Sequence, residues 1–288
     1  MIKRIVAILV VFMVFIGSTT FVESVTNYDK LMVNTLVTMR TNVVKKNPNF
    51  LMIINGGYNL YLPKARTKND IFKVIDGVII EDAFTHNDKR TMQKSLGEAI
   101  KKHKKAFSIE YKSFKGNKNV VSYKAKHNLD NIPKFKTKKY NVNNISDVKN
   151  FIAILDTHKY KSKKKFINVL KHTDYDLIFI DLFDESGHMF TKADIKALKV
   201  KHNGGKRIVC SYISVGEAEN YRYYWKKKWN KQRPKWIVKE NKEWKGNYKV
   251  KYWDSHWQHI LNGYMNKIVN AGFDGAYLDV IDAYEYFM

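Results

Sequence analysis

The sequence is poor in cysteine and lacks the short motifs that mark metal or disulfide chemistry. Its 288 residues contain one cysteine, Cys210, so an intrachain disulfide is excluded. Cys210 lies in a stretch with a strand pattern, which predicts a small core residue rather than a reactive thiol. No HExxH motif is present, and His256 and His259, three residues apart, form only a weak pattern. We therefore expect no metal ion and no cofactor.

Two further motifs are absent. No glycine-rich phosphate-binding fingerprint follows any of the apolar stretches, which counts against a doubly wound open sheet. No pattern of a serine or cysteine nucleophile with its partners is found either. The doubly wound sheet therefore remains only as the second choice of fold.

Acidic residues are scarce relative to basic ones. The chain has 27 Asp and Glu against 52 Lys and Arg, a net charge of +25. This balance favours anionic partners such as nucleic acid, acidic glycan, membrane or wall polymer, although lysines spread over solvated helix faces would produce it too. The basic runs at 101–105 and 163–165 contain no interleaved aromatic residues, so binding of nucleic acid is not favoured. With 44% hydrophobic residues the chain can bury a sizeable core, which excludes disorder throughout.

The N-terminus has the pattern of a secretory signal. Lys3 and Arg4 precede an apolar run over 5–16, and small residues follow it at 17–20. This run is short for a membrane-spanning helix, and no cysteine follows it, so a lipoprotein is not expected. Residues 1–24 are predicted to be a signal peptide, or an uncleaved anchor that would be the protein's only contact with a membrane. The protein is then expected to be secreted or held in a bacterial cell envelope.

The remainder alternates between apolar runs and helical patterns. Strands are expected at 50–54, 74–81, 106–111, 131–136, 151–156, 177–181, 207–213 and 274–279. Helices are expected at 27–46, 91–105, 119–128, 162–172, from 191 onward and at 256–270. Eight strands alternating with helices indicate a (β/α)8 TIM barrel, formed by residues 25–288 as a single domain. A barrel chain usually begins with a strand, whereas here a helix comes before the first strand. A chain cut at a different point of the same ring of strands would have this order.

Acidic residues stand where several of these strands end. The run 208–215 stops at Gly216, and Glu217 follows. The strand at 177–180 is followed by Asp181, and the last one ends on Asp279. Catalytic groups of α/β barrels lie at the carboxyl ends of the strands, so we expect these carboxylates to meet at one mouth. An acid in such a position can also cap a helix or pair with lysine.

Three stretches, residues 212–225, 246–257 and 272–287, resemble the bacterial branch of glycoside hydrolase family 114, the endo-α-1,4-polygalactosaminidase-like TIM barrels. The resemblance covers about 151–287 and implies hydrolysis of α-1,4-linked galactosamine polymers. Residues 47–57 and 75–84 look like strands that come later in that family. The resemblance therefore implies a circular permutant, in which 27–137 correspond to the family's C-terminal half and 148–288 to its N-terminal half. Two departures bear on mechanism: many members carry Asp at Asn220, and fungal members carry Glu at Tyr277.

Glycoside cleavage requires two carboxyl groups, and we expect Glu217, Asp279 and Asp181 to form the catalytic cluster. Glu217 follows a buried strand amid tyrosines and is the preferred general acid. Asp279 is the expected nucleophile or base, and Asp181 is expected to tune the pair or hold the sugar. The residues expected to bind substrate are Tyr212, Asn220, Arg222, Trp253, Tyr277, Asp282, Asn55 and Glu81. Further carboxylates at strand ends are Asp82, Glu110 and Asp156.

A long insertion over 219–253 follows the strand at 207–213, and all six tryptophans fall between Trp225 and Trp257. Such rings can stack on sugars, or can form a small core of their own, and Trp253 is expected among the exposed ones. Three functions remain open on the sequence: a hydrolase acting on an amino-sugar polysaccharide, a non-catalytic glycan-binding barrel, and a basic protein that binds anionic polymer.

Overall fold

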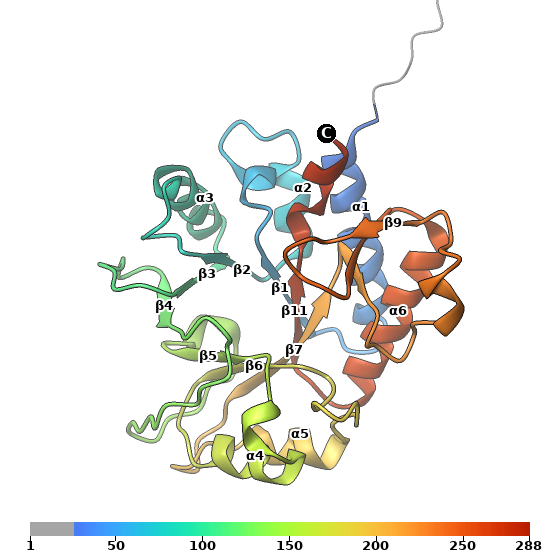
Figure 1. Ribbon diagram of the computed structural model, residues 1–288. Helices are drawn as coiled ribbons and strands as arrows, with labels where there is room; N and C mark the ends of the chain where they lie inside the picture. The colour runs from blue at the N-terminus through green and yellow to red at the C-terminus, as the bar shows by residue number, and fades with distance from the viewer. Residues whose placement is uncertain (1–25) are drawn as a thin grey trace, which may run out of the picture.

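A computed structural model describes residues 26–288, so the predicted signal peptide lies outside the described residues (Figure 1). Eight parallel strands form one sheet in the order β4-β3-β2-β1-β11-β7-β6-β5. Their bounds are β1 Leu51–Asn55, β2 Gly77–Glu81, β3 Lys105–Glu110, β4 Val121–Lys124, β5 Phe151–Ile154, β6 Leu177–Ile180, β7 Ile208–Ser214 and β11 Gly275–Asp279. At the seam β4 and β5 lie side by side, and the rings of Tyr123 and Phe151 pack with centroids 5.7 Å apart. The sheet is thus a nearly closed barrel, and the predicted α/β TIM-barrel fold is confirmed.

Aromatic side chains fill the inside of the barrel. Phe179 lies at the centre of this layer, with ring centroids 5.8 Å from Phe151, 6.3 Å from Phe107 and 5.0 Å from Tyr277. Tyr277 also stacks on Tyr212 at 5.8 Å. Inward-pointing residues come from alternate positions of each strand, so rings from five strands interdigitate as a packed core rather than a pore. Tyr277 faces inwards, as the alternation of Gly275, Tyr277 and Asp279 predicts.

Helices cover the outside of the ring (Figure 1). They are α1 Tyr28–Val44, α2 Lys68–Val74, α3 Lys89–Lys101, α4 Lys163–Lys171, α5 Lys192–Leu198 and α6 Ser255–Asn270. Helix α1 packs against both α6 and α2, so it occupies the helix position between the last strand and the first. β1 pairs with β11 in parallel register, Leu51 opposite Gly275. The strand that ends at Asp279 therefore lies beside the strand near Phe50, and the two halves of the chain close one ring. No helix in the described part of the chain is long and apolar enough to cross a membrane.

The fourth strand is not where the sequence pattern predicts it. The helix expected at 119–128 is wrong, because Val121–Lys124 forms β4 in register with β3. The strand expected at 131–136, around Pro133, is wrong as well, because that segment has no strand structure. Valine and tyrosine at alternate positions of β4 suit a pleated surface better than a helix, and the flanking lysines and asparagines conceal this pattern.

The return from β4 to β5 has no α-helix and is held instead by buried polar contacts. Lys201 Nζ lies 2.6 Å from Asp176 Oδ1, and neither side chain is exposed. The hydroxyl of Tyr140 donates to the same carboxylate, and Lys201 lies 3.7 Å from the centre of its ring. Tyr140, from the returning segment, is thereby fixed to the end of the barrel where the strands begin.

The insertion after β7 forms a three-stranded antiparallel sheet. Its strands are β8 Glu217–Glu219, β9 Ile237–Glu240 and β10 Asn247–Val250, in the order β8-β10-β9. Trp236 stacks on Trp257 of α6 at 5.4 Å, and Trp229 meets Trp236 edge-on at 5.3 Å. The short helical turns of the chain are η1 Tyr58–Tyr61, η2 Ile145–Asp147, η3 His158–Tyr160, η4 Lys227–Asn230 and η5 Ile281–Phe287. Trp229 and Trp236 of the insertion therefore form a satellite core against α6.

Candidate functional site

The carboxyl ends of the strands carry a cluster of acidic side chains around β1. Asn55, the last residue of β1, donates from Nδ2 to Glu81 Oε1 at 2.8 Å and to Asp279 Oδ1 at 2.9 Å. The hydroxyl of Tyr111 donates to Glu81 Oε2 at 2.6 Å. Glu81 ends β2 and Asp279 ends β11, the two strands that flank β1, so the barrel register itself brings the two carboxylates together. Both side chains remain partly open to solvent, whereas Asn55 is buried.

The backbone turns sharply after each of these two carboxylates. Asp82 has φ of 51° and Val280 has φ of 59°. A β-branched valine in the left-handed region is strained, and such strain is typical of sites where the surrounding structure fixes a turn. Gly216 lies against this turn, because a Cβ there would be 2.5 Å from the carbonyl oxygen of Val280 and 2.2 Å from Cβ of Ala283. Only glycine allows this approach.

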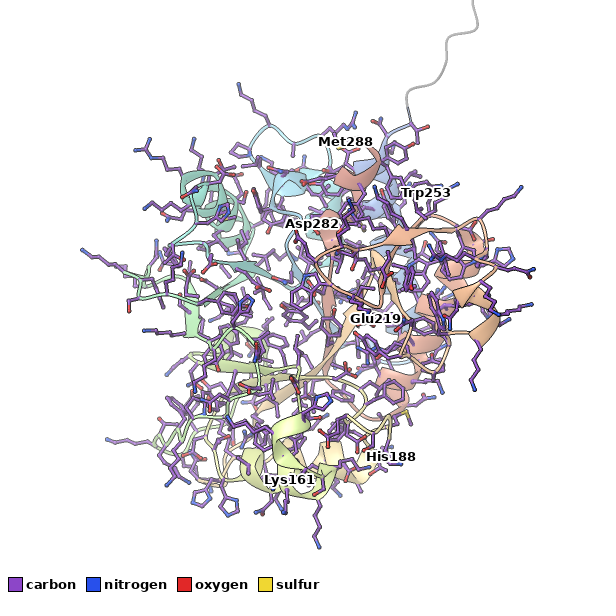
Figure 2. All side chains as sticks on the ribbon, viewed as in Figure 1. Lys161, His188, Glu219, Trp253, Asp282 and Met288 are labelled. Carbon is purple, nitrogen blue, oxygen red and sulfur yellow. The ribbon has the colours of Figure 1, made fainter. Side chains whose placement is uncertain are left out.

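Crowding at the mouth changes the proton affinity of two carboxyls. The pKa of Asp279 is raised to about 7, first by desolvation and second by the negative charge of Glu81. The pKa of Asp282 is raised to about 6, first by desolvation and then by Glu285. Asp282 lies in the first turn of η5. Its carboxyl group packs next to Gly56, 3.8 Å from where a Cβ of that residue would lie. Two groups that exchange protons near neutral pH therefore share the mouth (Figure 2 labels Asp282).

A buried arginine holds two further acids. Arg222 donates to both oxygens of Asp181, at 2.8 and 2.7 Å, and its Nε lies 2.7 Å from Glu219 Oε2. The hydroxyl of Tyr221 donates to Glu219 Oε1 at 2.6 Å. Burial opposes the charge of Arg222, but Asp181 and Glu219 outweigh it and raise its pKa. Asp181 and Arg222, both predicted site residues, thus form an ion-pair triad with Glu219, a partner that the sequence reasoning did not place in the site.

Glu217 is enclosed by the insertion. Glu217 is buried, with only 2% of the residue exposed. Its Oε1 accepts hydrogen bonds from Asn241 Nδ2 at 2.9 Å and from the hydroxyl of Tyr286 at 3.2 Å. The sequence reasoning missed both Asn241 and Tyr286. Asn241 directly follows β9 in the insertion, and Tyr286 lies in η5. The predicted role of Glu217 as general acid stays a prediction.

A cleft of about 560 Å³ opens beside the triad. Its acidic lining consists of Asp156, Asp181, Asp184 and Glu185. Tyr221 and Tyr223, 63% and 48% exposed, form its aromatic wall. A larger hollow, of about 830 Å³, lies at the opposite end of the barrel, near Arg40 and Asp274, away from all the predicted site residues.

The remaining predicted residues lie outside the acidic cluster or deeper than expected. Trp253 is half-buried, with its ring 5.2 Å from that of Tyr28, the first residue of α1, and 4.8 Å from that of Phe287 (Figure 2 labels Trp253). Its predicted exposure is therefore wrong. The exposed tryptophan is Trp244. Asn220 is exposed, and its amide lies where a Cβ of Gly246 would stand. Tyr212 and Tyr277 are buried in the barrel core, beneath the acidic cluster.

The other carboxylates at strand ends have separate contacts. Glu110 is fully buried and accepts from the Phe84 backbone N–H at 3.1 Å and from the Thr85 hydroxyl at 2.9 Å, so it holds the turn after β2. Asp82 accepts from the same hydroxyl at 2.8 Å. Asp156 pairs with His158 at 2.8 Å on the surface. Within residues 26–288, no three His, Cys, Asp or Glu side chains are grouped so that they could hold a metal ion.

Comparison with known proteins gives matches to part of the chain. Residues 157–287 match the model of glycoside-hydrolase family GH114. The uncharacterized protein MJ1477 of Methanocaldococcus jannaschii is 36% identical over 181 residues, 62% of this chain and 49% of the relative. An uncharacterized protein of Deinococcus radiodurans is 36% identical over 119 residues, 41% of this chain and 37% of the relative. The chain thus spans half or less of the length of these relatives.

One solved structure is also similar in part. The crystal structure of Aspergillus fumigatus Ega3 in complex with galactosamine is 20% identical and covers 53% of this chain and 51% of its own, with a TM-score of 0.34. A score this low carries no argument about the site. The family match rests on residues 157–287, which include β7, the insertion and β11 with its terminal carboxylate. This part of the chain, residues 157–287, is thus similar to glycoside-hydrolase family GH114.

Proposed function

We propose that the protein hydrolyses an amino-sugar polysaccharide, such as α-1,4-linked polygalactosamine, at the carboxylate-lined mouth of its barrel. The similarity of residues 157–287 to family GH114 supports the reaction class, and the mouth supplies acids of the kind that glycoside cleavage needs. We further propose that the barrel is a circular permutant of the family's arrangement, because α1 fills the helix position between β11 and β1. Secretion remains part of the proposal and rests on the sequence of residues 1–24 alone.

The observation that carries the choice of substrate is the acidic cleft. The protein has a net charge of +25, yet four carboxylates line this cleft, and its one arginine, Arg222, is already paired with Asp181 and Glu219. A deacetylated amino sugar is a cation that the protein as a whole repels. A local negative potential overcomes that repulsion at close range, because charges farther than about 8–10 Å are screened at physiological salt. The exposed rings of Tyr221 and Tyr223 offer faces on which sugars stack.

The test compares two forms of one polymer. Purified protein is incubated with deacetylated α-1,4-galactosamine polymer and with its N-acetylated form, and new reducing ends are counted over a pH series. We expect faster cleavage of the deacetylated polymer. Glu185→Gln and Asp156→Asn are each expected to raise KM for that polymer up to about fivefold, the effect of one exposed charge, and to leave the acetylated form unaffected. Asp70→Asn on α2, a carboxylate with a 59% exposed side chain outside the mouth, is the matched control.

Two other functions give different results in the same assay. A barrel that binds glycan without chemistry would retain the polymer and release no reducing ends, with no change in Asp279→Asn. A protein that binds anionic polymer would bind polyanions with a steep dependence on salt. Failure of the wild type to release reducing ends from either polymer at any pH would refute the hydrolase proposal.

A further inference from the structure

The carboxylates at the mouth differ in how accessible they are. Glu217 is 2% exposed, and its Oε1 is occupied by Asn241 and Tyr286. Asp181 is 7% exposed, and both of its oxygens accept from Arg222. A carboxylate that attacks a sugar, or gives it a proton, must reach the sugar atom directly. Glu217 and Asp181 are almost fully buried, so neither is open to a sugar.

Glu81 and Asp279 meet the requirement of access. Both are partly open to solvent at the mouth. Each keeps its position through hydrogen bonds from neutral donors: Asn55 to both, and the hydroxyl of Tyr111 to Glu81. Neither carboxylate has a cationic partner among the ion pairs of the described residues. The two carboxylates are thus held in place without a cation to balance their negative charge. The positive charge that develops on the sugar in the transition state of glycoside cleavage can then balance it.

The geometry of Asn55 also limits their separation. One nitrogen, Nδ2, donates to Glu81 Oε1 at 2.8 Å and to Asp279 Oδ1 at 2.9 Å. The facing carboxylate oxygens can therefore be no farther apart than these two lengths placed end to end. Carboxyl groups about 5–5.5 Å apart are found in retaining glycosidases and groups about 6.5–9.5 Å apart in inverting ones. Two carboxylates held by a single amide nitrogen therefore favour the closer, retaining arrangement.

On the basis of the proposed hydrolase function, we infer that Glu81 and Asp279 are the catalytic pair, with Glu81 as nucleophile and Asp279 as acid and base, and that hydrolysis retains the anomeric configuration. In the first step a Glu81 oxygen bonds to the anomeric carbon, the glycosidic C–O bond breaks, and the leaving oxygen takes the proton of Asp279. In the second step water attacks the same carbon and gives its proton to Asp279, and the ester bond to Glu81 breaks. Asn55 and Tyr111 are positioning residues for Glu81.

Asp279 is placed in the acid role by its surroundings. Asp279 lies beside Glu81 under the amide of Asn55, and desolvation together with the charge of Glu81 raises its pKa to about 7. A carboxyl with that pKa holds a proton to give at near-neutral pH and takes one back in the second step. The pair therefore needs neither the acid that other members carry at Asn220 nor the one that fungal members carry at Tyr277.

The experiment follows the anomer that forms first. An α-1,4-linked galactosamine oligomer is hydrolysed in an NMR tube, and the anomeric proton signals are recorded before mutarotation. We expect the α-anomer first. Glu81→Ala and Asp279→Ala are then assayed with sodium azide. A lost nucleophile predicts a glycosyl azide of inverted, β configuration from Glu81→Ala, and a lost acid and base predicts one of retained, α configuration from Asp279→Ala.

Isosteric variants separate chemistry from folding. Glu81→Gln and Asp279→Asn keep the size of the side chains and are each expected to lower kcat about 100- to 10,000-fold with the thermal unfolding midpoint maintained. Asp70→Asn on α2, an exposed carboxylate outside the mouth, is the control that is expected to keep wild-type rates. First release of the β-anomer, or near-normal turnover by Glu81→Gln, would overturn the inference while the hydrolase proposal stands. If the wild type cleaves no polymer, both the hydrolase proposal and the inference that rests on it are wrong.

Discussion

Replacement of Arg222 by methionine tests the triad that shapes the acidic cleft. The side chains of Arg222, Asp181 and Glu219 are 8%, 10% and 4% exposed, so both carboxylates rely on one guanidinium for compensation. Removing one partner of a buried ion pair costs about 3–5 kcal/mol, because the remaining charge stays desolvated without its counter-ion. Two carboxylates are orphaned here, so the upper part of that range is expected. For a domain of this size the loss corresponds to a fall of roughly 6–20 °C in Tm.

The measurement is urea unfolding followed by tryptophan fluorescence, with two comparison proteins. Lys73→Met breaks an exposed pair with Asp70, whose side chains are 73% and 59% exposed, and is expected to cost under about 1 kcal/mol. The triple variant Arg222→Met, Asp181→Asn, Glu219→Gln removes the orphaned charges and is expected to regain at least half of the loss. If Arg222→Met costs no more than Lys73→Met, or if neutralising the acids restores nothing, the triad does not stabilise the fold through charge compensation.

Two further predictions follow from the mouth. Because the pKa of Asp279 is raised to about 7 in the folded protein, its stabilising contribution is fully present below its ordinary value of 3.8 and is lost as pH rises through about 7. Asp279→Asn is therefore expected to flatten the fall of Tm between about pH 4 and pH 7. The kcat/KM of the wild type is expected to fall as pH rises through about 7, and a Tm profile unchanged by the substitution contradicts the assignment. Gly216→Ala brings a Cβ within 2.2 Å of Ala283 and is expected to cost about 1–3 kcal/mol, whereas Gly263→Ala in α6, with no atom within 4 Å, is expected to stabilise by up to about 1 kcal/mol. Equal effects of these two glycine substitutions in urea unfolding would show that the contact at Gly216 is relaxed at little cost.

The sequence predicts most of the ring because strand signals in a parallel barrel are local. Seven of the expected strands contain apolar runs, interrupted at most by a serine, and these runs become β1–β3, β5–β7 and β11. Each run ends in a polar residue where the chain leaves the sheet, so the acids at the mouth are visible too. The fourth strand fails because two of its four residues, Ser122 and Lys124, are polar, so it does not stand out from a lysine-rich surrounding.

The state of each acid could not be predicted, because it depends on distant parts of the chain. Glu217 is enclosed by Asn241 and Tyr286, which come 24 and 69 residues later. Asp181 is paired with an arginine 41 residues away. The sequence shows that a strand ends in a carboxylate, but it does not show whether the insertion folds over that carboxylate or leaves it open. For this reason the sequence favours Glu217, whereas the structure favours Glu81.

The two halves of the chain contribute differently to the acidic cluster. The residues that match the family, 157–287, include β11 with Asp279 but neither β1 nor β2. Asn55 and Glu81 come from the first half and reach Asp279 because β1 pairs with β11 on one side and with β2 on the other. The stretches Asp76–Glu81 and Asp274–Asp279 share a glycine at the strand start and an acid at the end, and each is followed by a residue with positive φ. Two similar strand-and-turn units thus present their carboxylates to one amide from the strand between them. A protein truncated to the matching residues would keep one carboxylate of the pair and lose the other, so the proposed chemistry requires both halves of the ring.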